Sequence, residues 1–140
     1  MGYCTIDDLI ERFGETELLS LTDRDNNGAI DVQVANVAIE DASATIDGFL
    51  AGRYDLPLSS IPPVLVRLCT AMARYNLYGN AVNEVVEKNN TAAVNFLTAV
   101  GKGDLLLGMP DTDESPAGDD AIEMQNAGTV FNRANSTGFI

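Results

Sequence analysis

The sequence predicts an all-α fold, a small bundle of about four to five helices followed by a long extended C-terminal tail. Apolar residues recur three and four positions apart in several segments, which places them on one face of a helix. Residues that start or stop helices separate these segments. The chain has 140 residues, 46% hydrophobic and 21% charged, which suits one globular domain with a real core. We therefore expect a helical domain over residues 1–108 and an acidic extended arm over residues 109–140.

The N-terminal segment predicts two short helices. Thr5 and Asp8 have the spacing of a capping box, in which each side chain accepts the backbone N–H of the other residue. The first helix should end at Gly14, a residue that tolerates the backbone angles after a helix. A second short helix is expected over Glu17–Leu21. The segment Thr22–Gly28 that follows has the composition of a turn.

A long helix is predicted from Val32 to Ala51, with Asp31 as its N-cap, spanning about 30 Å. Its predicted core face consists of Ala35, Ile39, Ala42, Ile46 and Phe49. Its predicted polar face consists of Gln33, Asn36, Glu40, Ser43 and Asp47. Gly52 should end the helix, and residues 53–61 should form a loop that carries Arg53, Tyr54, Leu56 and Leu58.

Two more helices complete the predicted bundle. Pro62-Pro63 suits the first turn of a helix, because proline's missing N–H is not needed there. The core stripe of that helix is expected to be Leu65, Leu68, Met72 and Tyr75, with Arg67 and Arg74 on another face. The last helix should cover residues 83–100 and bury Val86, Ala93, Leu97 and Val100. Asn89 and Asn90 make its middle polar, and the 101–103 segment, Gly-Lys-Gly, should end it.

The tail after residue 108 is rich in acids. It holds Asp111, Asp113, Glu114, Asp119, Asp120 and Glu123, against the single base Arg133. Such a segment cannot bury enough apolar surface to offset its ordering entropy, so alone in water it should be disordered. Aromatic and arginine side chains are preferred anchors in interfaces. We therefore interpret Phe131, Arg133 and Phe139 as anchors that hold the arm on a neighbouring subunit, the alternative being a free end.

The negative charge of the chain argues against some classes of binding partner. With 21 Asp and Glu against 8 Lys and Arg, the formal net charge is −13. Such a chain repels phosphate backbones and anionic lipids, so specific nucleic-acid binding and membrane docking are not expected. No apolar run has the length of a transmembrane helix. Two cysteines in a chain without histidine predict neither a zinc site nor a disulfide framework. We expect Cys69 to be buried as a small hydrophobic side chain, and the reducing cytoplasm to be the compartment of the protein.

The segment from Asp23 to Asp31 resembles the first half of an EF-hand calcium loop. Its oxygen-bearing side chains at the ligand positions are Asp23, Asp25, Asn27 and Asp31. The twelfth position, which should hold a bidentate Glu, is Val34. We favour an Asx-rich turn in which Asp31 caps the next helix, and keep a weak calcium-dependent binding module as the alternative function.

The residue composition and spacing give little support for an enzymatic function. The usual general base, histidine, is absent, and no Ser or Cys has a partner suggested by spacing. Adjacent acids such as Glu40 and Asp41 diverge around a helix, so they do not converge on a substrate. We predict a protein that is not an enzyme and needs no cofactor. Arg67 and Arg74 share one helix face, and that stripe either faces water or meets an acidic stripe across a subunit boundary.

A series of segments resembles a family of small proteins from Mu-like phages and prophages. The series comprises YCTIDDLIERFG (3–14), LTDRD (21–25), GAID (28–31), ASATIDGFLAGRYDLPL (42–58), IPPVLVRL (61–68) and ARYNLY (73–78). It continues with the 101–108 segment, VFNR (130–133) and the GF pair at 138–139. The resemblance spans nearly the whole chain, and its specificity comes from the order of the segments.

This resemblance implies a structural virion protein, a head–tail adaptor or connector located at the head–tail interface after assembly in the host cytoplasm. Such an adaptor binds under the portal, forms a ring, commonly twelvefold, that extends the DNA channel, and provides the docking surface for the next connector, stopper or tail protein. Genomic DNA would pass through without specific binding. The expected interface residues are Arg53, Tyr54, Leu56, Leu58, Arg67, Arg74, Phe131, Arg133 and Phe139.

Overall fold

The computed structural model describes residues 2–108, which form an all-α fold and confirm the predicted class. The helices are α1 (Ile6–Phe13), α2 (Glu15–Thr22), α3 (Val32–Leu50), α4 (Pro63–Tyr78) and α5 (Glu84–Lys102), with one 3-10 turn, η1 (Gly79–Ala81). The predictions for the arm, including the anchors Phe131, Arg133 and Phe139, lie outside the described residues and stay predictions.

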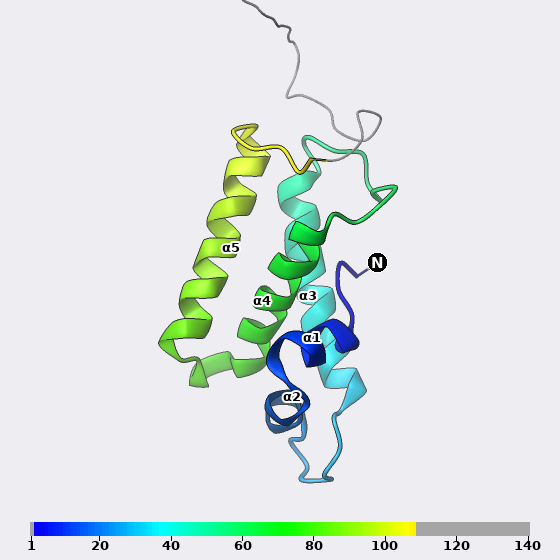
Figure 1. Cartoon of the computed structure of the whole chain (residues 1–140), viewed down its shortest axis with the longest axis vertical. Coiled ribbons are helices and arrows are strands. Elements are labelled where there is room, and N and C mark those ends of the chain that lie inside the picture. The colour runs from blue at the N-terminus through cyan, green and yellow to red at the C-terminus, as the bar shows by residue number, and fades with distance from the viewer. Residues whose placement is uncertain (1, 109–140) are drawn as a thin grey trace, which may run out of the picture.

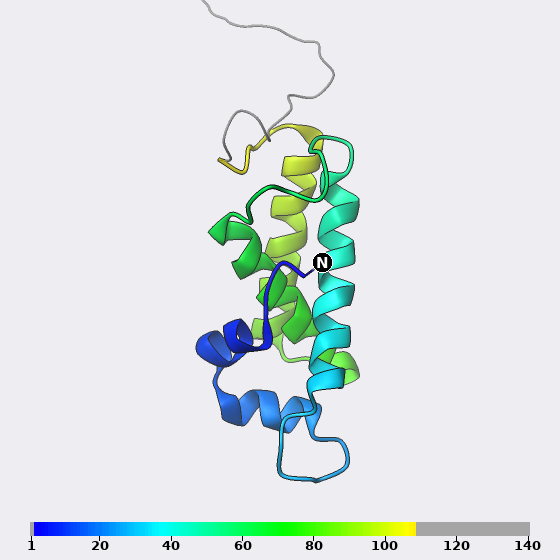
Figure 2. The ribbon, with the colours of Figure 1, turned by 90° about the vertical axis from the view of Figure 1, so that its right-hand side faces the viewer.

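Three long helices form the body of the molecule. Helices α3, α4 and α5 stand side by side and run up, down and up (Figure 1). The short helices α1 and α2 pack on α3 and α4 at one end of this bundle, whereas α5 contacts only α3 and α4 among the α-helices. Figure 2 shows the N-terminal segment crossing from α3 toward α4 before α1 begins. Helix α4 is therefore the central element, because every other helix contacts it.

The helix ends follow the capping signals in the sequence. The Thr5 N–H donates to the Asp8 carboxylate at 2.9 Å, and the Asp8 N–H donates to the Thr5 hydroxyl at 3.2 Å, which completes the predicted capping box. The Asp31 side chain accepts from the first-turn amides of α3. Asn83 caps α5 in the same way, and Gly103 ends it in a left-handed conformation.

Some local predictions differ from the structure. Helix α2 is longer than the predicted 17–21 segment at both ends. Ser43, expected on the polar face of α3, is buried, because its hydroxyl accepts the Tyr3 N–H at 3.0 Å. Phe49 and Tyr75 are only partly buried, and Leu50 and Leu77 are buried in their helices. Helical periodicity therefore placed the end of each apolar stripe correctly to within one position in α3 and two positions in α4.

The core lies where α3, α4 and α5 meet. Ile46, Leu65, Leu97 and Val100 are each fully buried there. All four positions predicted to be buried in α5 are buried, so the polar pair Asn89 and Asn90 does not interrupt that helix. Among residues 2–108, no helix combines the length and the apolar character needed to cross a bilayer.

Candidate functional site: an arginine-lined groove

Three of the predicted interface residues are buried inside the subunit. Arg53, Tyr54 and Leu58 are between 4% and 7% exposed, and Tyr54 accepts the Leu107 N–H at 3.3 Å. The loop after α3 thus packs against the chain that follows α5, an arrangement that local sequence patterns did not indicate. Leu56, at 36% exposed, is the member of this loop set that offers apolar surface to another molecule.

The buried Arg53 guanidinium lies against the end of α5. Its Nε and Nη1 atoms are buried and have no hydrogen-bond partner among residues 2–108. A Cβ atom added at Gly103 would meet Nη1 at 2.6 Å, which shows how closely the guanidinium covers this glycine. Burying a charged group without acceptors for its N–H groups is unfavourable. The contribution of Arg53 at this position is therefore mainly packing of its side chain against the end of α5.

Arg74 is held within the subunit by an ion pair that joins α4 to α2. Its Nε and Nη2 atoms donate to the two carboxylate oxygens of Glu17 at 2.6 and 2.9 Å. The guanidinium also stacks over the Phe13 ring at 4.3 Å. The hydrogen bond to Glu17 raises the pKa of Arg74 above its ordinary value, with burial opposing this shift. Arg74 therefore stabilises the fold, and its predicted contact with a neighbouring subunit stays a prediction.

Replacing Glu17 with Gln should lower the free energy of unfolding by about 1–2 kcal/mol, because the partly buried Arg74 guanidinium loses its charged acceptor. Chemical unfolding followed by circular dichroism measures the change. Glu15→Gln is the matched control, since Glu15 is exposed in the same helix and should change stability by less than about 0.5 kcal/mol. Equal effects of the two variants would contradict the role given to the Glu17–Arg74 pair.

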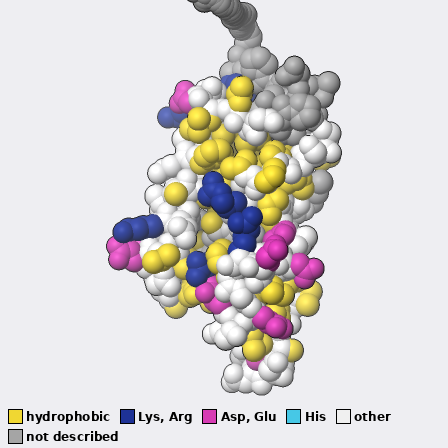
Figure 3. Space-filling model, viewed as in Figure 1, with side chains coloured by type: hydrophobic (Ala, Val, Ile, Leu, Met, Phe, Trp, Pro, Cys, Tyr) yellow, Lys and Arg dark blue, Asp and Glu magenta, His cyan; other side chains and the backbone are white. Residues whose placement is uncertain are grey.

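Arg67 differs from Arg74 in being exposed. With Arg12 of α1 it lines a groove of about 340 Å³, whose walls also include Phe13, Leu68, Thr70, Ala71, Asn89 and Ala92 from α1, α4 and α5. Neither arginine has an ion-pair partner among residues 2–108. Basic side chains gather near the middle of the face seen in Figure 3. In a chain of net charge −13, two arginines that lack an ion-pair partner in the described part of the subunit form an exposed basic site, which we call the arginine groove.

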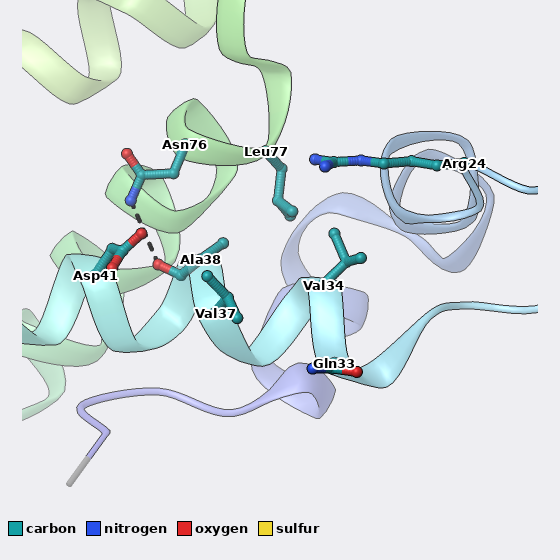
Figure 4. Close-up of a pocket in the computed structure, with 8 residues that line it drawn as sticks. All are labelled: Arg24, Gln33, Val34, Val37, Ala38, Asp41, Asn76 and Leu77. Atoms are coloured by element: carbon teal, nitrogen blue, oxygen red, sulfur yellow. Dashed lines mark hydrogen bonds between the residues drawn. The ribbon is translucent and has the colours of Figure 1, made fainter.

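A second groove of about 290 Å³ lies between the start of α3 and the end of α4. Figure 4 shows Arg24 reaching toward it from the turn after α2, with Val34 and Val37 rising from α3. Val37 is 50% exposed, and the Asn76 amide donates to the Ala38 carbonyl at 3.3 Å. The lining mixes single charges of both signs with apolar groups, so it presents contact surface without a convergent set of reactive groups.

The Asp23–Asp31 loop is a capped turn, as favoured by its composition. The two carboxylate oxygens of Asp23 accept the N–H groups of Asn27 and Gly28, each at 2.7 Å. The Asp31 N–H donates to the buried Thr22 hydroxyl at 3.1 Å, which ties α2 to the start of α3. The part of the chain between residues 2 and 108 contains no group of three or more His, Cys, Asp or Glu side chains placed to hold a metal ion. Asp25, Asn27 and Asp31 thus add nothing in support of the calcium-binding alternative.

Residues 2–108 thus form a small helical protein whose surface carries a basic groove and several exposed apolar side chains. The chain belongs to the family described as Bacteriophage Mu, Gp36, and the sequence model of that family matches residues 3–126. It is 36% identical to the Mu-like prophage FluMu protein gp36 of Haemophilus influenzae, over 99% of this chain and 98% of that protein. It is 37% identical to Gene product J of Escherichia phage Mu over the full length of both. The predicted relationship to Mu-like phage proteins is confirmed.

Proposed function

We propose that this phage protein is a structural, non-catalytic head–tail adaptor that acts by assembly. In this proposal copies of the chain form a ring beneath the portal, which extends the DNA channel and presents a docking surface to the next connector or tail protein. A twelvefold ring is the expected form. The protein would assemble in the host cytoplasm and reside in the virion at the head–tail interface.

The observation that carries the proposal is the segregation of charge along the chain. The arginine groove exposes Arg12 and Arg67 without partners in the described part of the subunit, while residues 111–123 carry six acids and no base. A closed ring needs two different, complementary patches on each subunit. The acidic arm of one copy and the arginine groove of the next meet that requirement.

The overall charge also supports passage of DNA through a ring of such subunits. With 21 acids against 8 bases, the chain has little positive charge with which to retain a phosphate backbone. The two unpaired arginines of the groove are engaged by the arm in this proposal, so the channel would remain acidic. DNA then slides past without specific binding.

The test is electron microscopy of a lysate of the encoding phage with this gene disrupted. Filled or emptied heads beside complete, unattached tails are expected, and adding back the purified full-length protein should restore joined, infectious particles. Normal infectious particles from the disrupted phage would overturn the adaptor function. The same add-back assay, carried out with protein variants, tests the proposed subunit interface separately from the adaptor function.

The interface is tested by adding back the Arg12→Glu, Arg67→Glu double variant. It should fold normally by circular dichroism, because both arginines are exposed and unpaired, yet restore at least tenfold fewer joined particles. Lys102→Glu is the matched control, since Lys102 is also an exposed base in the last turn of a helix, as Arg12 is. Full restoration by the double variant would remove the groove from the interface and leave the adaptor function standing.

A further inference from the structure

The two cysteines, 65 positions apart in the sequence, meet in the interior. Cys4 precedes α1 and Cys69 lies in the middle of α4, and their sulfur atoms are 2.9 Å apart. Both are free thiols. Cys69 is fully buried and Cys4 is 7% exposed. The sequence predicted Cys69 to be a buried small hydrophobe, and its contact with Cys4 is a long-range feature that spacing does not indicate.

The surroundings give the two sulfur atoms different chemical characters. The Cys4 thiol donates to the Cys69 sulfur, and the Ser43 hydroxyl lies 3.6 Å from the same sulfur. The hydrogen bond from Cys4 lowers the pKa of Cys69, although burial opposes it. The same hydrogen bond and burial raise the pKa of Cys4. The hydrogen bond between the two sulfur atoms thus favours ionisation at Cys69 over ionisation at Cys4.

Cys4 is the sulfur that a small reagent can reach. It belongs to the short segment before α1, which Tyr3 attaches to α3 through its N–H to Ser43 and its hydroxyl to the Asp47 carboxylate. The Cys4 segment is not helical, and such segments open more readily than a packed central helix such as α4. Detachment of this segment from α3 would expose Cys4, whereas Cys69 lies in the middle of the central helix α4.

We propose that Cys4 and Cys69 form an intramolecular disulfide when the folded protein meets a low-molecular-weight disulfide. The exposed Cys4 thiolate attacks the small disulfide, forming a mixed disulfide and releasing one small thiolate. When the segment closes, the Cys69 thiolate attacks the Cys4 sulfur and releases the second small thiolate. The two released thiolates take up the two protons that the cysteine thiols lost on ionisation. The two cysteine thiols are oxidised and the small disulfide is reduced to two thiols.

Little movement is needed to form this bond. The sulfur atoms must approach by less than about 1 Å to reach the bonded distance of about 2.05 Å. The bond would fasten the N-terminal segment to α4 and close a long loop in the unfolded chain. This inference does not depend on the proposed function, because it concerns the isolated subunit.

The test incubates the purified full-length protein with oxidised glutathione under native conditions, then blocks free thiols and maps disulfides by mass spectrometry. A Cys4–Cys69 cross-linked peptide from monomeric protein is expected, together with the loss of both alkylatable thiols. The oxidised protein should unfold at a midpoint about 10 °C higher or more, and reduction with dithiothreitol should reverse the shift.

Two variants supply the matched controls. Cys69→Ser should stop at a stable mixed disulfide on Cys4, and Cys4→Ser should remain unmodified because Cys69 is buried. Reduced thiols in the wild-type protein after this treatment would overturn the proposal, as would a stable mixed disulfide or a dimer linked through Cys4. Because the wild-type peptide map alone decides between these outcomes, misfolding of either variant leaves the proposal testable.

Discussion

Replacing Leu97 with alanine is expected to lower the free energy of unfolding by about 3–4 kcal/mol. Leu97 is fully buried in α5 and belongs to the core cluster that also includes residues of α3 and α4. Its truncation removes apolar contacts and leaves a cavity that three long helices cannot easily close. Within the described part of the chain α5 contacts no α-helix other than α3 and α4, so no further helix there compensates for the loss.

Urea unfolding followed by far-ultraviolet circular dichroism measures this loss, and Leu106→Ala is the control. Leu106 is 60% exposed beyond the end of α5, so its truncation should change the free energy of unfolding by less than about 0.5 kcal/mol. A loss below about 1 kcal/mol for Leu97→Ala would contradict the packing of α5 described above.

The fold was predictable where its signals are local. The capping box of Thr5 and Asp8, the Asp31 cap and the buried face of α5 depend on residues within a turn or two of one another, so sequence spacing contains them. Even the weak helix formers Asn89 and Asn90 are accommodated in α5. Packing of the flanking apolar face outweighs a propensity difference of some tenths of a kcal/mol per residue.

The candidate site was less predictable because it depends on contacts between distant segments. Ser43 is buried by Tyr3, and Arg74 is paired with Glu17, at separations of 40 and 57 positions. Helical spacing placed Arg67 and Arg74 on one face of α4 but left open what that face contacts. The presence of Arg12 beside Arg67 depends on how α1 crosses α4. The periodicity of the sequence does not indicate how two helices cross, so Arg12 was not predicted as an interface residue.

Replacing Gly103 with alanine should lower the free energy of unfolding by about 2–4 kcal/mol, for two separable reasons. Gly103 has a φ of +88°, which is unfavourable for a residue with a Cβ atom. The new Cβ would also lie 2.6 Å from Nη1 and 2.9 Å from Cζ of the buried Arg53 guanidinium. Gly28→Ala is the control for the first reason, because Gly28 has a φ of +77° and open space around it, so about 1 kcal/mol is expected.

Arg53→Met isolates the second reason in a double-mutant cycle measured by urea unfolding. Methionine retains the apolar stem and removes a guanidinium whose Nε and Nη1 lack partners, so this variant alone should be near neutral. In that background Gly103→Ala should cost only about 1 kcal/mol, since a flexible thioether can move away from the new methyl group. Additive effects in the cycle would instead mean that Arg53 does not cover Gly103, and that the loss comes from the backbone alone.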